Sequence, residues 1–297
     1  MNGELVATQS QTGNIPNTGI ARISGYDNNN ETWNGNIAQF SIYNRALTAA
    51  EVQQNYNALK SRYYIAGAND PYISNVITLL HMDGTNGSTT FTDSSLSAIT
   101  YSRYGSPTIS TAQSKFGGAS GYFNGTGSIY VSNPNTVFGQ ISGDFTLECW
   151  INWVSTPPGN ANGNERTIIG QSNWPETVNG NWWWFYGLNT GFGFGVYNGG
   201  SGEGVGYSFT WQANRWYHLA VSRSNGTLYL FLDGTLVSSA ASTKPLFVDN
   251  VREFSIGGDS GGNSTLCNAY IDEVRFTKGI GRYTSSFTPS TSPFFNP

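Results

Sequence analysis

Between residues 215 and 241 the chain carries three short runs of apolar and β-branched residues, separated by tight-turn dipeptides. The runs are Trp216–Ser222, Thr227–Leu232 and Thr235–Ser238, with Asn-Gly at 225–226 and Asp-Gly at 233–234 between them. Asn-Gly and Asp-Gly supply the positive φ angles of two-residue hairpin loops. The pattern therefore predicts a three-stranded antiparallel meander.

Residues 145–154 alternate over a longer distance, with apolar side chains at the odd positions and mixed ones at the even positions. One face of this strand is therefore predicted to be core. Further strands are predicted at Gly127–Val131, Thr167–Gln171, Trp182–Leu188, Phe192–Tyr197, Gly204–Thr210, Glu253–Ile256 and Ala269–Thr277. Many short strands separated by turns predict an all-β fold, an antiparallel two-sheet jelly-roll sandwich.

The first sixty residues repeat the pattern at the end of the chain. Residues 2–6 match 233–237 and residues 36–42 match 270–276, with an offset that drifts only from 231 to 234 residues. Residues 1–63 are therefore predicted to be a partial copy, the C-terminal portion of the jelly roll. Residues 64–72 are predicted to be a linker and residues 73–297 the complete domain.

The partial copy is predicted to end in a short helix, because Thr48 and Glu51 have the spacing of a capping box. Its predicted strands lack the neighbouring strands that the repeat places before them, so their backbone N–H and C=O groups need other hydrogen-bond partners. A second copy of the chain, another protein or an edge of the complete domain could supply them. We expect a homo-oligomer with a contact formed by Trp33, Phe40, Ile42, Tyr43, Val52 and Tyr56.

Composition narrows the function. Charged residues make up only 11% of the chain, and 37 glycines accompany 14% aromatics, as expected for strands and tight turns. The net charge of −4 and the lack of a basic cluster exclude nucleic acid as an expected partner. No apolar run approaches the roughly 20 residues of a membrane span, and the first residues lack a secretory signal. Cys149 and Cys267 are predicted to be buried thiols, although a single bridge stays open.

Leu228–Val237, Phe254–Gly258 and Ala269–Phe276 together resemble a laminin G-like domain of the concanavalin A-like superfamily. Residues 118–125, 145–151 and 216–221 fit the same pattern. The resemblance covers residues 73–295 and, for its last part, residues 1–63. It implies the jelly-roll fold but is a poor guide to the ligand, since this fold carries lectins, hydrolases and structural modules.

Leu79–Gly84, Thr92–Ser95 and Thr277–Pro289 are similar to modules in structural proteins of tailed bacteriophages. The resemblance implies a virion component, either a capsid decoration or fibre or a tail appendage, with other virion proteins and host-surface glycans as partners. The alternative is a secreted or cell-surface carbohydrate-binding lectin module of a bacterium. Genome neighbourhood separates the two.

An enzymatic role is not expected. Glucan hydrolases of this superfamily need two carboxyl groups about 5 Å apart. Asp272 and Glu273 are neighbours on one strand, which places their side chains on opposite faces, and Glu148 has no acidic residue two positions away. No catalytic residue is therefore predicted.

Calcium is expected by resemblance, because laminin G-like relatives often bind the ion near the meeting of the chain ends. The resemblance implies Asp83, Asp93 and Asp272 as ligands, with carbonyls and water completing the oxygen shell. The other interpretation is that these aspartates cap turns.

Carbohydrate binding is expected where aromatic side chains gather with amides, because sugar C–H faces stack on rings and hydroxyls pair with Asn or Gln. The richest stretch contains Trp174, Trp182, Trp184, Tyr186 and Tyr197. Alternation puts Trp182, Trp184 and Tyr186 on one face of a strand and Trp183 and Phe185 on the other. One face must be core. The other is either a ligand surface or covered by packing.

Overall fold

The computed structural model describes residues 40–48, 51–52, 55, 70–158, 165–171, 181–246, 248, 250, 252–259 and 265–296. The chain divides into two compact units, Met1–Ile65 and Ala66–Pro297. In the first unit the Thr48 amide donates to Glu51 Oε2 at 2.8 Å, and the Glu51 amide donates to Thr48 Oγ1 at 3.2 Å. This reciprocal pair is the predicted capping box. Most of the predicted partial copy lies outside the described residues.

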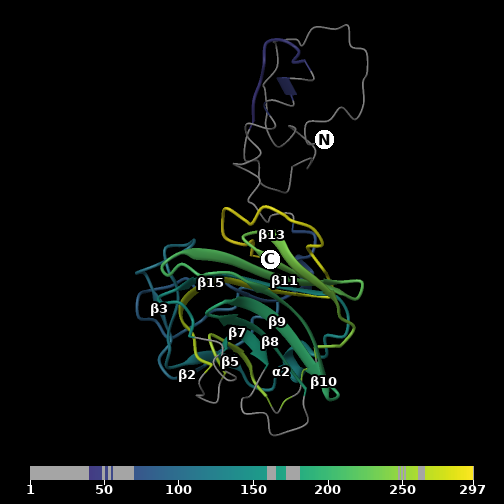
Figure 1. The fold of residues 1–297 in the computed structure, drawn as a ribbon. Helices are drawn as coiled ribbons and strands as arrows, with labels where there is room; N and C mark the ends of the chain where they lie inside the picture. Colours follow the sequence, from purple (N-terminus) through teal and green to yellow (C-terminus); the bar gives the residue numbers. More distant parts are fainter. Residues whose placement is uncertain are drawn as a thin grey trace. The chain divides into compact units, whose positions relative to one another are not determined.

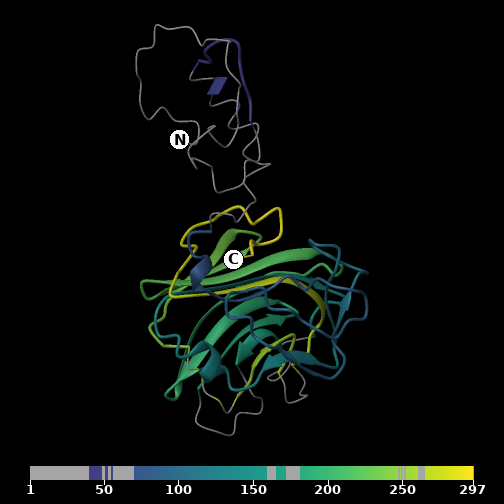
Figure 2. The same ribbon diagram turned by 180° about the vertical axis from the view of Figure 1, so that it is seen from behind.

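The second unit is a sandwich of two antiparallel sheets, as predicted (Figures 1 and 2). The eight-stranded sheet runs β13 (Thr235–Ala241), β12 (Thr227–Leu232), β11 (Trp216–Ser224), β6 (Phe145–Trp153), β15 (Asn268–Lys278), β4 (Ser120–Asn124), β3 (Thr108–Ser110), with β1 (Val76–Leu80) also paired to β15. The seven-stranded sheet runs β10 (Ser201–Ser208), β9 (Gly191–Asn198), β8 (Trp182–Leu188), β7 (Arg166–Gln171), β14 (Phe254–Ile256), β5 (Ser128–Val131), β2 (Ser102–Tyr104).

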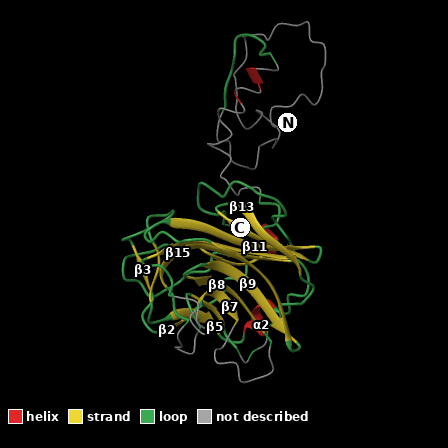
Figure 3. Ribbon diagram, in the orientation of Figure 1, coloured by secondary structure: helices red, strands yellow, loops and turns green. Residues whose placement is uncertain are grey.

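Helix is scarce in the described part of the second unit (Figure 3). It consists of the short 3₁₀ turn η1 (Ile73–Asn75) and the five-residue helix α2 (Pro134–Phe138). No helix among the described residues is long and apolar enough to cross a membrane.

The predicted meander is β11, β12 and β13, joined by the two expected hairpins. Asn225 and Gly226 have φ values of 48° and 75°, and Asp233 and Gly234 have 49° and 77°. Positive φ at both central residues is the type I′ geometry that matches the twist of the flanking strands. The sequence also predicted β5 to β10, β14 and β15 with shifts of at most three residues at their ends, whereas the shorter β1 to β4 were not predicted.

The core lies between the sheets and is rich in aromatic side chains. Phe194, Phe145, Phe276 and Phe254 are at most 1% exposed and pack in that order, with successive ring centroids 5.6–6.2 Å apart, and Trp183 contacts Phe254. Cys149 and Cys267 are free and buried, and burial raises the pKa of both thiols. They act as small apolar side chains.

The second face of β6 differs from the expectation of a mixed surface, because all nine residues of this strand are buried. One reason is a cover formed by the C-terminal segment, which Figures 1 and 2 show in yellow on the side of β11 away from β8 and β9. Trp150 of β6 is covered instead by Lys115 and Phe116. Tyr283 and Phe287 stack at 3.6 Å, and Phe287 packs edge-on against Phe231 at 5.3 Å and His218 at 5.7 Å.

A buried ion pair holds this cover in place. Arg275 on β15 donates to Glu148 Oε1 on β6 from Nε at 2.9 Å and from Nη2 at 2.7 Å. Tyr283 donates to Glu148 Oε2 at 3.1 Å, and Asp70 accepts two hydrogen bonds from Arg282 at 2.8 and 2.7 Å. Burial by itself raises the pKa of Glu148, but the charge of Arg275 and the nearby His218 lower that pKa to about 2.

We predict that Glu148→Gln lowers the free energy of unfolding by about 3–5 kcal/mol, because it removes the main counter-charge of the buried Arg275 and leaves only the longer contact with Asp70 at 3.3 Å. The pKa of Glu148 is lower in the folded chain than its usual 4.5. The stabilisation is therefore complete above pH 4.5 and disappears as the pH falls towards 2. Urea unfolding at pH 7 and at pH 3 measures both effects.

The matched control is Asp233→Asn, which removes an exposed pair with Arg215 at 3.1 Å. Such pairs contribute less than about 1 kcal/mol. Equal losses in the two variants at pH 7 would contradict the structural role of Glu148.

Candidate functional site

The outer face of β8 carries the aromatic side chains that the sequence singled out. Trp183 and Phe185 are 1% and 0% exposed and point into the core, whereas Trp182, Trp184 and Tyr186 are half-buried on the other face. The predicted alternation is confirmed. Trp174 lies outside the described residues.

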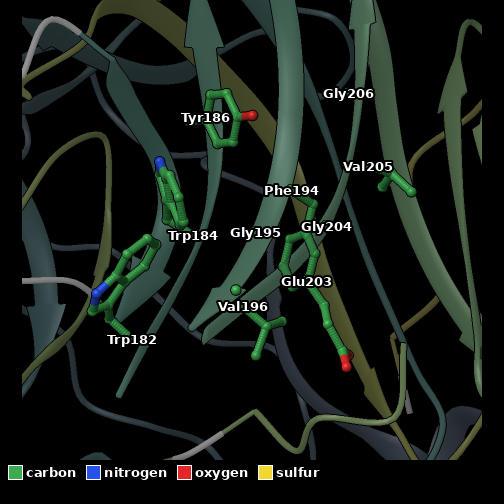
Figure 4. A pocket seen from close by; sticks show the side chains of 11 residues that line it. Trp182, Trp184, Tyr186, Phe194, Gly195, Val196, Glu203, Gly204, Val205 and Gly206 are labelled. Atoms are coloured by element: carbon green, nitrogen blue, oxygen red, sulfur yellow. The ribbon is translucent and has the colours of Figure 1, made fainter. Parts of the chain in front are cut away.

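The outer rings touch one another along the strand and across to β9. Trp182 stacks on Tyr197 with ring centroids 5.1 Å apart and planes 5° apart. Trp184 lies 4.1 Å from Trp182 and 4.9 Å from Tyr186. We call Trp182, Trp184, Tyr186 and Tyr197 the aromatic ladder. Its rings contact one another in a row, and Figure 4 shows the three on β8.

Glycines occupy the positions next to this ladder. Trp184 faces Gly195 on β9, which faces Gly204 on β10, and Tyr186 similarly faces Gly193 and then Gly206. Trp182 faces Tyr197 and then Gly202. We call Gly202, Gly204 and Gly206 the glycine track; Figure 4 labels two of them on the strand beyond Gly195.

The β9 glycines are required by the rings that lie over them. A Cβ on Gly195 would come within 2.4 Å of the Trp184 ring, and one on Gly193 within 2.5 Å of the Tyr186 hydroxyl. Without side chains at these two positions, the rings lean over β9.

The three ladder rings on β8, those of Trp182, Trp184 and Tyr186, and the glycine track line a trough of about 400 Å³ (Figure 4). Its lining includes one ionisable carboxyl group, that of Glu203, and no Lys, Arg or His. Glu203 Oε2 accepts the amides of Thr243 at 3.0 Å and Lys244 at 3.1 Å. Although burial raises the pKa of Glu203, these hydrogen bonds lower it overall, so the group carries a negative charge.

Some polar groups near the ladder already have hydrogen-bond partners within the chain. Asn181 accepts the amide of Gly199 through Oδ1 at 3.2 Å, which fixes the end of β8 to the β9–β10 turn. Trp182 Nε1 is buried and has no hydrogen-bond partner among the described residues.

Two of the three expected calcium ligands approach the same loop. Asp272 Oδ2 accepts the amides of Lys115 at 2.7 Å and Phe116 at 3.2 Å. A Cβ on the next residue, Gly117, would come within 2.0 Å of Asp83 Oδ1. Asp272 Oδ1 is buried and has no partner within the described part of the chain, and burial, aided by the charges of Glu273 and Asp83, raises the pKa of Asp272 to about 7.

The carboxylate of Asp93 caps a turn. Its oxygens accept the amides of Leu79, Ser95 and Ile99 at 2.8–2.9 Å and the Ser95 hydroxyl at 2.8 Å. Within the described residues, no three His, Cys, Asp or Glu side chains come together in a group that could hold a metal ion. Among the described residues, two carboxylates therefore lie close to the 115–117 loop, those of Asp83 and Asp272.

The carboxyl groups considered for catalysis have structural partners. Glu148 is enclosed in the ion pair with Arg275. Glu273 accepts the Phe294 amide at 2.7 Å and lies 2.7 Å from His81 Nδ1. The alternation expected to separate Asp272 from Glu273 is interrupted by a β-bulge, in which Glu273 has a φ of 50°.

Of the six expected contact residues in the first unit, four are described. Phe40, Ile42, Tyr43 and Val52 are 57%, 76%, 51% and 41% exposed. Trp33 and Tyr56 lie outside the described residues.

A family model described as the concanavalin A-like lectin/glucanases superfamily matches residues 1–53 and 123–279. Comparison with the sequences of curated proteins finds no match.

Solved structures share the fold at low identity. Domain 4 of AbnA, an extracellular arabinanase from Geobacillus stearothermophilus solved in complex with arabinotriose, has a TM-score of 0.50 and 17% identity, over 69% of this chain and 93% of that one. The binding domain of Paraclostridial Mosquitocidal Protein 1 has a TM-score of 0.52 and 15% identity over 73% and 50%. The binding domain of Botulinum Neurotoxin DC, in complex with SialylT, has a TM-score of 0.50 and 15% identity, over 69% of this chain and 48% of that one. The chain spans about half the length of these two toxin domains.

Proposed function

The chain belongs to the concanavalin A-like lectin/glucanases superfamily, and from this membership we propose that it is a non-enzymatic protein that binds carbohydrate in the trough between β8 and β10. The observation that carries the proposal is the aromatic ladder, which presents ring faces beside an open floor. Sugars offer C–H faces to such rings and hydroxyl groups to nearby polar atoms.

The fold alone is compatible with catalysis or binding, so the carboxyl groups decide our choice. A retaining glycosidase needs two free carboxyl groups about 5 Å apart beside the substrate. In the trough Glu203 is the one carboxylate among the described lining residues, and it accepts two backbone amides. The arabinanase domain solved with arabinotriose shares the fold; at 17% identity it supports the plausibility of a sugar ligand rather than its identity.

We predict that Trp184→Ala weakens binding of the full chain to its glycan at least tenfold, about 1.4 kcal/mol, because it removes the central ring of the ladder. Tyr104→Ala is the matched control, since Tyr104 is 40% exposed on β2 at the opposite edge of the same sheet. A glycan array followed by calorimetry measures both. Equal affinities for the wild-type chain and Trp184→Ala would contradict the proposal.

We also propose a structural calcium ion at Asp83 and Asp272, with carbonyl oxygens and water completing its shell. The partnerless Asp272 Oδ1 and the closeness of both carboxyl groups to the 115–117 loop support it.

Excess Ca²⁺ should then raise the melting temperature above that in chelator, by mass action on the folded state. Asp272→Asn should abolish this difference. Asp93→Asn should lower the melting temperature equally in both solutions, because Asp93 caps a turn. An unchanged wild-type melting temperature in chelator and in excess Ca²⁺ would rule out the ion.

We propose further that the chain assembles with itself through the first unit, where four large apolar side chains are exposed. Light scattering of the full chain should give a mass above that of one chain, and Ile42→Asp should reduce it. Leu96→Asp, at a 68% exposed position of the second unit, is the control. A well-folded full-length monomer would contradict self-assembly.

For location we propose a bacteriophage virion, as a capsid decoration or fibre or a tail appendage in contact with other virion proteins. The similarity of residues 79–84, 92–95 and 277–289 to phage structural modules supports it. The alternative is a secreted or cell-surface bacterial lectin. Identification of the chain in purified particles, or its absence from them, separates the two.

A further inference from the structure

The glycine track contains a feature that packing within the chain does not explain. Glycine in a strand costs about 0.5–1 kcal/mol relative to alanine, so each one on β10 needs a reason. Gly204 has one, because a Cβ there would come within 2.5 Å of the Phe194 carbonyl oxygen. Gly206 has none: the nearest atom to its Cβ would be 3.8 Å away. At Gly202 the nearest atom would be at 3.4 Å, an ordinary contact.

A glycine with open space above it commonly marks a place where a ligand or another backbone approaches closely. Gly202, Gly204 and Gly206 are all exposed and share one face of β10, since alternate residues of a strand point the same way. The side chains between them do not intrude: Val205 is buried in the core, and Glu203 is held by the amides of residues 243 and 244. The track is therefore a bare strip of backbone.

The shape of this strip indicates the length of the ligand. Three consecutive outward positions of a strand span about 13 Å, and the ladder on β8 has the same length. The two lie side by side, two strand spacings of about 4.8 Å apart. Such a trough is longer than it is wide and runs parallel to the strands, which suits an extended chain better than one terminal sugar.

The charge of the lining indicates the chemistry of the ligand. None of the described lining residues is basic. The Glu203 side chain alternates onto the other face of β10, where the amides of residues 243 and 244 hold its carboxylate, so it does not reach the track. A carboxylated or sulfated sugar would therefore find no cation among these lining residues to pair with. Flat neutral sugars can lie with one edge against the rings of the ladder and the other over the bare backbone.

We propose that the trough takes an unbranched, neutral polysaccharide of at least three sugar units, which lies along the strands with the glycine track as its floor. This proposal rests on the proposed carbohydrate-binding function and specifies the ligand class of the same site. A side chain at Gly202 or Gly206 would occupy the space of the ligand without disturbing the fold.

The test uses the full chain and two substitutions, Gly206→Val and Ser208→Val. A panel of linear cello-, xylo-, manno- and arabino-oligosaccharides identifies the best neutral ligand. Gly206→Val should bind it at least tenfold more weakly while its melting temperature is unchanged or raised, because valine favours a strand and its Cβ would come no closer than 3.8 Å to another atom. Ser208→Val is the control, since Ser208 lies on the same face of β10 just beyond the trough lining; it should bind as the wild type does.

Three results would overturn the proposal, each in a distinguishable way. If no panel member binds the wild-type chain, the carbohydrate-binding function itself fails. If binding depends on Trp184 but is equal in the wild type and Gly206→Val, the glycine track is not the floor and only this proposal fails. If Gly206→Val instead lowers the mass of the chain in light scattering, the track contacts another protein copy.

A second comparison tests the ligand class. Carboxylated or heavily branched polysaccharides of the same backbone should bind at least tenfold more weakly than the linear neutral form. Equal affinity for the carboxylated form would show that charge is not selected against, and would contradict the neutral-ligand assignment.

Discussion

The buried pair of Glu148 and Arg275 decides which surface of the sandwich is left for binding. A charged pair on the outer face of a sheet is tolerated away from water only when both charges are matched. Here Arg275 satisfies Glu148, Tyr283 adds a further hydrogen bond, and Asp70 anchors Arg282 of the same segment. The C-terminal segment therefore lies across the outer face of the eight-stranded sheet near β6 and β11. The outer face of the seven-stranded sheet keeps the exposed strand β10 and its trough.

Side-chain size then shapes the trough. On β8 the large rings sit at every second position, and their partners across the sheet on β9 and β10 are mostly glycines. The rings can lean over β9 only because Gly193 and Gly195 have no side chains. Above Gly206 there is space that no neighbour fills, and a Cβ at Gly202 would make only an ordinary contact with Tyr197. The alternation of side chains along the strands, which buries Trp183 and Phe185, thus also places the rings of β8 and the glycines of β9 and β10 on the same outer face.

Local patterns predicted much of this from the sequence. The hairpins at 225–226 and 233–234 and the two faces of β8 depend on neighbouring residues, and they are confirmed. The burial of both faces of β6 depends on Tyr283 and Arg275, more than 120 residues away, so no local pattern contained it. The β-bulge at Glu273 likewise could not be predicted, because alternation assumes regular pairing. The glycine track was visible as alternate glycines at 202, 204 and 206, but the strand was predicted to begin only at Gly204.

The central claim is that the ladder and the glycine track form one surface for a linear neutral glycan. A crystal structure of the full chain with the best-binding linear oligosaccharide tests it most directly. The account predicts sugar rings against Trp184 and Tyr186, with the chain of sugars running over Gly204 and Gly206. A sugar bound at another surface, or a trough filled by a second protein chain, would contradict it.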